Sequence, residues 1–142
     1  MRAIAILAAL AALLALTGNA NAADRSVLMS GRSTYGQVLF DGRGFALYAF
    51  THDKHSKSTC DGACAKAWPP YLVDSAAKAG TGTRSSLLGT TRRSDGRLQV
   101  TYAGRPLYYY IGDRKPGQVL CQNVAEFGGT WLVVRPSGAL VR

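Results

Sequence analysis

The chain has 142 residues, which is enough for one domain or for two very small ones. Charged residues make up 18% of the chain and 16 residues are glycine, so the composition excludes a coiled coil and a disordered polyampholyte. Lys and Arg number 17 against 8 Asp and Glu, which gives a formal net charge of +9. Because no aromatic–basic motif accompanies this charge, we expect no nucleic-acid partner and assign the excess to a basic protein surface.

The first 22 residues predict a secretory signal peptide. Arg2 gives the N-terminal end of this segment a positive charge. Residues 3–16 then form an uncharged apolar run, which is shorter than the about 20 residues needed to span a bilayer. Ala20-Asn21-Ala22 then places small residues at a cleavage site, and a retained membrane anchor is the alternative. We expect cleavage after Ala22, no lipid anchor because no cysteine precedes Cys60, no transmembrane segment afterwards, and a protein that is soluble in the periplasm or secreted.

The first half of the remaining chain predicts a hairpin followed by a short helix. Residues 37–40 and 45–50 are strand-like runs on either side of a glycine-containing turn. A polar loop then leads to an alanine-rich segment near 62–68, which we expect to be helical and to end at Pro69-Pro70. An edge strand is expected in the lead-in, at 27–29.

The second half predicts two more hairpins. The runs 88–93 and 97–102 flank an Asp-Gly turn, which is a strong hairpin signal, and the second run alternates as a half-buried strand does. A last hairpin joins 130–134 to 139–141, and the small-residue segment 75–86 is expected to be a loop. These short strands and frequent turns predict a mainly β protein, built as a small antiparallel domain with one short helical insert.

One motif occurs twice, 60 residues apart. The pattern Gly-x-x-Leu-Tyr-x-aromatic-x-x-Asp occupies residues 44–53 and again residues 104–113, with no gap. A match of this length predicts a duplication of a hairpin unit. We expect repeat one at about 35–72 and repeat two at about 88–135 of a single domain that spans 23–142.

The motif places aromatic side chains at positions i and i+2, which share one face of a strand, while the preceding leucine faces the other way. These rings either pack in the core, where each buries about 150–250 Å², or form an exposed aromatic face that binds a partner. The candidate binding residues are Tyr48, Phe50, Trp68, Tyr108 and Tyr110, together with the motif acids Asp53 and Asp113.

The two motif acids have two interpretations. Asp53 and Asp113 lie where each strand should end, a position at which a carboxylate accepts hydrogen bonds from turn amides. Alternatively, two carboxylates about 5–10 Å apart would serve acid–base chemistry or bind a hard cation. The chain has no Gly-x-Ser-x-Gly, P-loop or dinucleotide-binding motif, so no catalytic residue is assigned.

Three cysteines follow the expected cleavage site, and an oxidising compartment predicts a disulfide between two of them. The pair Cys60 and Cys64 is favoured, with a non-helical start to the helical insert. Cys121 is then either a buried free thiol or the site of an intermolecular disulfide, and its pairing with Cys60 or Cys64 stays open.

His52 and His55 precede these cysteines and complete a formal set of zinc or copper ligands. The spacing is not that of a zinc finger, and an oxidised cysteine pair supplies no thiolate. We therefore expect no cofactor, and keep zinc or copper as the alternative.

Several motifs occur in a fixed order along the chain: Tyr48-x-Phe50-x-x-Asp53, Cys60-x-x-x-Cys64, Trp68-Pro69-Pro70, Asp95-Gly96, and Pro106-Leu107-Tyr108-x-Tyr110-x-x-Asp113. This series, which covers about residues 35–135, resembles a bacterial family of secreted and lipoprotein repeats of unknown function with a Tyr-x-aromatic-x-x-Asp motif. The resemblance implies a location in the cell envelope, a β domain of paired repeats and no established enzymatic activity. The chain departs from the family in lacking the lipidated cysteine, in having Cys121, and in having His52 and His55 outside the motif.

These observations favour an exported, non-catalytic envelope module that presents an aromatic face to an envelope protein or to an anionic surface. The alternative is a periplasmic metal-binding or redox accessory protein that uses segment 52–64. A hydrolase that uses Asp53 and Asp113 is the third hypothesis.

Overall fold

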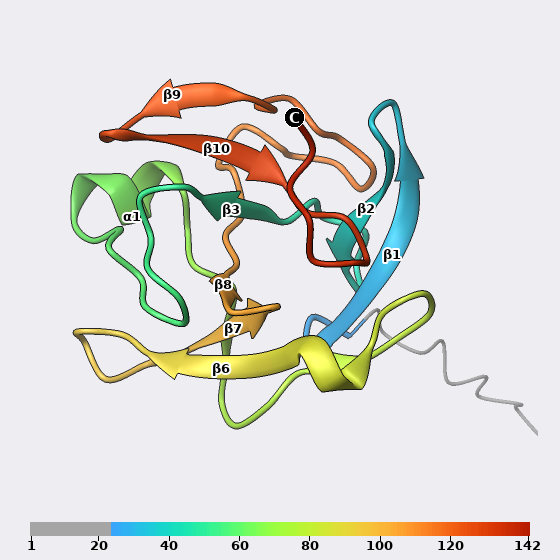
Figure 1. The fold of residues 1–142 in the computed structure, drawn as a ribbon, viewed down its shortest axis with the longest axis horizontal. Coiled ribbons are helices and arrows are strands. Elements are labelled where there is room, and N and C mark those ends of the chain that lie inside the picture. Colours follow the sequence, from blue (N-terminus) through green and yellow to red (C-terminus); the bar gives the residue numbers. More distant parts are fainter. Residues whose placement is uncertain (1–23) are drawn as a thin grey trace, which may run out of the picture.

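The computed structural model describes residues 24–142, which form short strands in three small sheets with one short helix (Figure 1). The expected signal peptide, residues 1–22, lies outside the described residues. The strands are β1 (Val27–Ser33), β2 (Gly36–Asp41), β3 (Tyr48–Phe50), β4 (Leu72–Val73), β5 (Lys78–Ala79), β6 (Leu88–Arg92), β7 (Leu98–Tyr102), β8 (Arg105–Pro106), β9 (Val124–Glu126) and β10 (Gly129–Val133). The helix α1 spans Ala63–Ala67 and a 3-10 turn spans Ser85–Leu87. The mainly β class and the helical insert near 62–68 are confirmed.

The three sheets have different strand orders. One is β2-β1-β5, the second is β3-β10-β9, and the third is β4-β7-β6 with β8 paired to β7. Figure 1 shows β10 lying between β3 and β9, above the β6–β7 pair, with β1 and β2 along one side. Within the described residues, no helix is long and apolar enough to cross a bilayer.

The strand predicted at 27–29 is present as the start of β1, but it is longer than expected and it is not an edge strand. β1 runs over seven residues and lies between two partners, antiparallel to β2 and parallel to β5. The parallel partner is the two-residue strand β5, inside the segment expected to be only loop. A pairing this short has no pattern of its own in the sequence, because strand periodicity needs about four residues to be visible.

The first predicted hairpin forms only near its turn. The Gly44 amide donates to the Asp41 carbonyl at 2.8 Å, and Phe40 bridges to Ala46. Beyond this point the chain leaves β2, and β3 pairs with β10 instead, with Phe50 opposite Trp131. All three residues of β3 are buried, because core residues cover both of its faces.

The second hairpin, β6–β7, forms as predicted across its Asp-Gly turn. The half-buried character of β7 was wrong, because Gln99 and Thr101 are buried together with their apolar neighbours. The Gln99 amide donates to the Leu107 carbonyl and its oxygen accepts from Arg93, both at 2.8 Å, so the buried polar side chain is satisfied. The last hairpin forms close to its turn, where the Arg135 amide donates to the Ala139 carbonyl, the Val141 amide donates to the Val133 carbonyl and Val134 bridges to Leu140. β10 itself pairs mainly with β3 and with β9, a strand that was not predicted.

The core lies in two clusters on opposite faces of the central strands. Tyr48, Phe50 and Tyr108 belong to one cluster, and Leu47 and Leu107 belong to the other. The alternation expected from the motif is therefore confirmed in both repeats. Complete burial of each of these large side chains stabilises the fold by about 1.5–3 kcal/mol.

Candidate functional site

The two copies of the motif meet at their tyrosines. The Tyr48 amide donates to the Tyr108 carbonyl at 2.8 Å, and the Tyr108 amide donates to the Tyr48 carbonyl at 2.9 Å. This antiparallel bridge connects β3, in the second sheet, with the segment that follows β8 in the third. The centre of the molecule is thus a contact between equivalent residues of the two repeats.

Each tyrosine hydroxyl donates to the motif aspartate of the other repeat. The Tyr48 hydroxyl lies 2.7 Å from Asp113 Oδ2, and the Tyr108 hydroxyl lies 2.7 Å from Asp53 Oδ2. The sequence indicates the two residue types and their spacing, but not this exchange of partners between repeats. We call these four residues the Tyr–Asp lock.

The second oxygen of each aspartate accepts from a loop amide of its own repeat. Asp53 Oδ1 accepts from the Thr59 amide at 2.7 Å, and Asp113 Oδ1 accepts from the Leu120 amide at 3.0 Å. Each carboxylate therefore orders the loop that follows it, as expected for amide capping. Both oxygens of each aspartate are already hydrogen-bonded within the protein, which speaks against their use as a catalytic pair.

Burial dominates the electrostatics of the lock. Desolvation raises the pKa of both Asp53 and Asp113, although the tyrosine and amide donors oppose the shift. Desolvation also raises the pKa of Tyr48 and Tyr108, and the adjacent carboxylates raise it further. At neutral pH the phenols therefore remain protonated donors.

The glycine that opens each motif is in contact with a loop of the other repeat. The Ser56 amide donates to the Gly104 carbonyl at 2.7 Å, and the Gly117 amide donates to the Gly44 carbonyl at 2.8 Å. A Cβ on Gly104 would overlap the His55 ring, so this glycine leaves the space that His55 fills. The two repeats are therefore interlocked through loops as well as through the lock.

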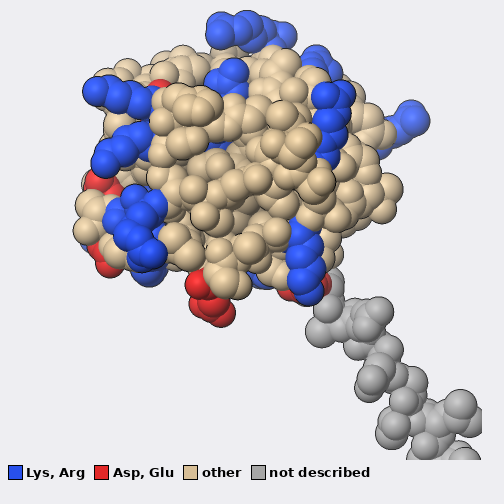
Figure 2. All heavy atoms as spheres, turned by 60° about the horizontal axis from the view of Figure 1, so that its bottom comes forward, with Lys and Arg blue, Asp and Glu red and all other residues tan. Residues whose placement is uncertain are grey.

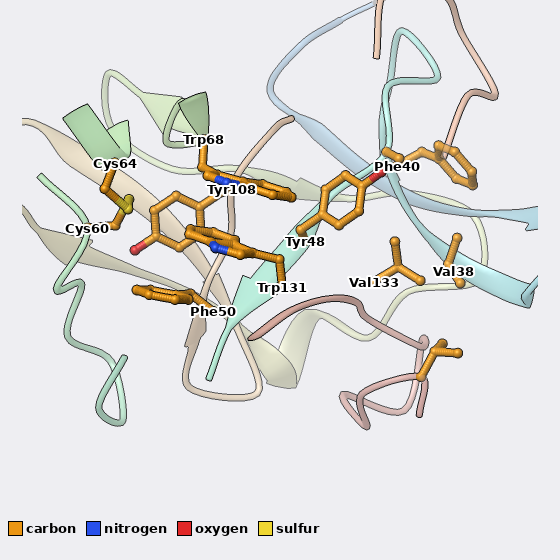
Figure 3. Packing of buried hydrophobic residues seen from close by; sticks show 12 residues of the cluster. Val38, Phe40, Tyr48, Phe50, Cys60, Cys64, Trp68, Tyr108, Trp131 and Val133 are labelled. Atoms are coloured by element: carbon orange, nitrogen blue, oxygen red, sulfur yellow. A yellow bond between two sulfur atoms is a disulfide. The ribbon is translucent and has the colours of Figure 1, made fainter. Parts of the chain in front are cut away.

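Stacked rings form the largest buried feature beside the lock. Phe50 stacks on Trp131 with centroids 4.2 Å apart, and Trp131 stacks on Trp68 at 4.1 Å (Figure 3). Tyr110 also packs against Trp68, with ring centroids 4.8 Å apart and the rings tilted by 37°. The rings of Phe50 and Tyr110, equivalent motif positions, thus each pack against one of two stacked tryptophans.

The tyrosines of the lock contact the tryptophans edge-on. Tyr48 lies 5.3 Å from Trp68 and Tyr108 lies 5.1 Å from Trp131, both with T-shaped geometry. Trp131 is therefore the counterpart of Trp68 in repeat two. It was not among the predicted site residues because it follows Asp113 at a longer spacing than that between Asp53 and Trp68.

The motif aromatics are core residues and do not form a surface. Tyr48, Trp68 and Tyr108 are fully buried, and Phe50 is 4% exposed. Tyr110 is half-buried. Of the two interpretations of the motif aromatics, packing in the core therefore holds for four of the five rings, which form no exposed face, and Tyr110 alone keeps part of its surface open.

Cys60 and Cys64 form the expected disulfide, with Cα atoms 5.3 Å apart. Cys60 lies before the first helical residue, in agreement with the non-helical start of the insert.

Cys121 is half-buried and free. It directly follows Leu120, whose amide donates to Asp113, just as Cys60 directly follows Thr59, whose amide donates to Asp53. It therefore occupies the equivalent place in repeat two, where Ala125 stands at the position that corresponds to Cys64.

The His and Cys side chains that suggested a metal site have other contacts. The disulfide uses both thiols, His52 packs 5.8 Å from the Phe50 ring, and His55 packs on Gly104. Across residues 24–142, no three His, Cys, Asp or Glu side chains gather in a way that would hold a metal ion.

A family model described as a secreted repeat of unknown function matches the chain twice, at residues 30–71 and 89–135. The two matches contain the two copies of the motif and cover more than half of the chain. No curated protein and no solved structure matches it.

Proposed function

Since the chain belongs to a family of secreted repeats of unknown function, we propose that it is an exported, non-catalytic module that binds an anionic membrane surface of the cell envelope. The Tyr–Asp lock supports the non-catalytic part of this proposal. Its hydroxyl and carboxylate groups hydrogen-bond within the protein, and its role is to hold the two repeats together.

The uneven distribution of exposed acids carries the choice of partner. Three acids, Asp41, Asp53 and Asp113, accept hydrogen bonds inside the protein. Four exposed acids lie at one end of the molecule, around two adjoining clefts: Asp24, Asp61, Asp74 and Asp95. Away from that end, Glu126 is the one exposed acid among the described residues, and its carboxylate accepts from the Trp68 indole at 2.9 Å.

Basic side chains are spread over the rest of the surface, with few acids among them. Away from the two clefts they are Arg32, Arg43, Lys54, Lys57, Arg84, Arg105, Arg114, Lys115, Arg135 and Arg142. On the face drawn in Figure 2 the basic side chains surround an uncharged centre, and the acidic ones lie at the left and lower edges. A surface with so few acids is attracted to a negative membrane without requiring a shaped pocket.

Sedimentation with lipid vesicles tests the proposal. Protein that spans residues 24–142 should bind vesicles that contain phosphatidylglycerol, should not bind phosphatidylcholine vesicles, and should be released by high salt because the interaction is screened. Equal binding to both vesicle types, or binding that salt leaves unchanged, would contradict the proposal.

A pair of charge variants localises the binding surface. Each Lys or Arg near an anionic surface contributes about 1 kcal/mol, so Arg114→Ser with Lys115→Ser should weaken binding by roughly thirtyfold. The matched control, Lys78→Ser with Arg92→Ser, removes the same charge at the acid-bearing end and should bind nearly as wild type does. Equal losses in both variants would show that only total charge matters.

A further inference from the structure

A cleft of about 610 Å³ opens between α1, the segment Pro69-Pro70 and the β6–β7 turn. Its volume lies in the range of small-molecule sites, about 300–1,000 Å³. Its charged lining residues are Arg25, Lys66, Arg93 and Arg97, with Asp61 and Asp95. The cleft lies at the acid-bearing end, so it is separate from the membrane-binding surface proposed above.

Arg93 is a buried cation in the wall of this cleft. Its side chain is 2% exposed, and its four terminal N–H groups donate to the Ser58 hydroxyl, the Gln99 amide oxygen, the Cys60 carbonyl and Asp61. Its Nε–H has no acceptor within residues 24–142. This nitrogen is itself fully buried, so Arg93 is a fixed part of the wall and not a donor that a ligand in the cleft reaches.

Two further cations of the cleft have no carboxylate partner. Asp61 is paired with Arg93 at 2.9 Å, and Asp95 is paired with Arg97 at 2.7 Å. Within the described part of the chain, Arg25 and Lys66 form no ion pair. The Tyr71 hydroxyl donates to the Arg25 carbonyl at 2.6 Å, which fixes the backbone of Arg25 at the edge of the cleft.

An apolar wall accompanies these charges. Pro69, Pro70 and the half-buried ring of Tyr109 line the same cleft. The Tyr109 hydroxyl donates to Asp41 Oδ2 at 2.9 Å, so the ring is held in place. The Arg43 guanidinium lies over the same ring, 5.8 Å from its centroid. The apolar surface that the cleft offers to a sugar ring is therefore formed by the two prolines together with the part of the Tyr109 ring that Arg43 leaves uncovered.

We infer that this cleft binds a small saccharide that carries an oxyanion, either a carboxylate or a phosphate. Arg25 and Lys66 supply the unpaired positive charges for charge-assisted hydrogen bonds to the oxyanion, and Arg93, paired with Asp61, holds the wall of the cleft in place. The Tyr109–proline wall takes the sugar ring. The volume leaves room for the ring as well as for the anion, which distinguishes this site from one for a free inorganic ion.

Calorimetric titration of the protein that spans residues 24–142 tests this inference with three probes: digalacturonate, glucose 6-phosphate and neutral lactose. At least one acidic sugar should bind saturably below about 10 mM, whereas lactose should not. Whichever acidic sugar binds more tightly identifies the oxyanion as carboxylate or phosphate. Lactose that binds as well as the acidic sugars, or acidic sugars that show no saturation, would overturn the inference.

Two double variants locate the binding. Arg25→Ala with Lys66→Ala should weaken acidic-sugar binding at least about tenfold, while Lys57→Ala with Arg84→Ala removes the same charge elsewhere and should leave it unchanged. Exposed side chains are replaced in both, and circular dichroism checks that both fold. Binding that survives the first variant, or falls equally in both, would show that the cleft is not the site. Vesicle binding, measured in parallel, tests the proposed function separately.

Discussion

At the scale of single residues, the motif Tyr-x-aromatic-x-x-Asp forms contacts between repeats. The tyrosine of one copy donates to the aspartate of the other, and each aspartate also orders its own loop. A hydrogen bond to a charged group contributes about 1.5–3 kcal/mol, and leaving the carboxylate buried without its donor adds to the loss. The motif residues are therefore expected to determine stability.

A double-mutant cycle tests the exchange of partners. Tyr48→Phe removes the donor of one hydrogen bond and Asp113→Ala removes its acceptor, so their effects on the free energy of unfolding should be non-additive by about 1 kcal/mol or more. Tyr48→Phe with Asp53→Ala combines residues that do not bond, and should be additive within about 0.5 kcal/mol. Urea unfolding measures both cycles. The opposite pattern would mean that each tyrosine pairs within its own repeat.

The pH dependence of stability follows from the same carboxylates. Burial raises the pKa of Asp113 in the folded state above its usual 3.8. In the pH range between 3.8 and this raised pKa, the folded state therefore binds a proton more tightly than the unfolded state does. The contribution of Asp113 therefore becomes more favourable as the pH falls from neutral toward 3.8. Urea midpoints at several pH values should show wild type gaining stability relative to Asp113→Asn as acid is added. A constant difference, or one that moves the other way, would refute the shift.

At the scale of elements, glycine and loop contacts decide how closely the repeats approach. Gly104 has φ +72° and lies under the His55 ring, whereas Gly96 has φ +84° and open space, with no atom within 4 Å of the point where a Cβ would lie. Both conformations disfavour alanine, but only Gly104→Ala also displaces a ring. A glycine at position 104 of the motif thus leaves the space that His55, in the loop of the other repeat, occupies.

Alanine at these two glycines separates strain from steric conflict. Gly96→Ala should cost about 1 kcal/mol from backbone strain alone, and Gly104→Ala should cost at least about 1 kcal/mol more because His55 must move. In a His55→Ala background, the excess cost of Gly104→Ala should disappear. Thermal unfolding of these variants provides the measurement, and an excess that persists without His55 would assign it to another neighbour.

At the scale of the whole molecule, neither repeat contains its own core. β3 of repeat one pairs with β10, the stacked tryptophans come from both repeats, and each Tyr–Asp pair spans them. Each half alone would leave buried tyrosines and carboxylates without partners. The folded unit of this chain is therefore the pair of repeats.

Fragment complementation tests this dependence. A break after Ser75, an exposed residue, separates 24–75 from 76–142. Each fragment alone should lack the near-ultraviolet circular dichroism of packed tryptophan, and mixing the two should restore it. The intact chain is the control, and a fragment that folds alone would contradict the shared core.

Features that depend on a few neighbouring residues could be predicted from the sequence. The duplication, the helix near 62–68, the β6–β7 hairpin and the Cys60–Cys64 disulfide were of this kind, because residue type and short spacing set local backbone geometry. The amide capping by Asp53 was also local. The composition likewise indicated the basic surface.

Partner choice over long distances was decided only by the tertiary structure. The pairing of β3 with β10, the burial of the motif aromatics and the hydrogen bond from Tyr48 to Asp113 each join residues more than 60 positions apart or depend on such contacts. Strand alternation says which side chains share a face, but not whether another layer covers that face. Here the second repeat supplies the cover, and so the aromatic residues that looked like a binding surface are the centre of the core.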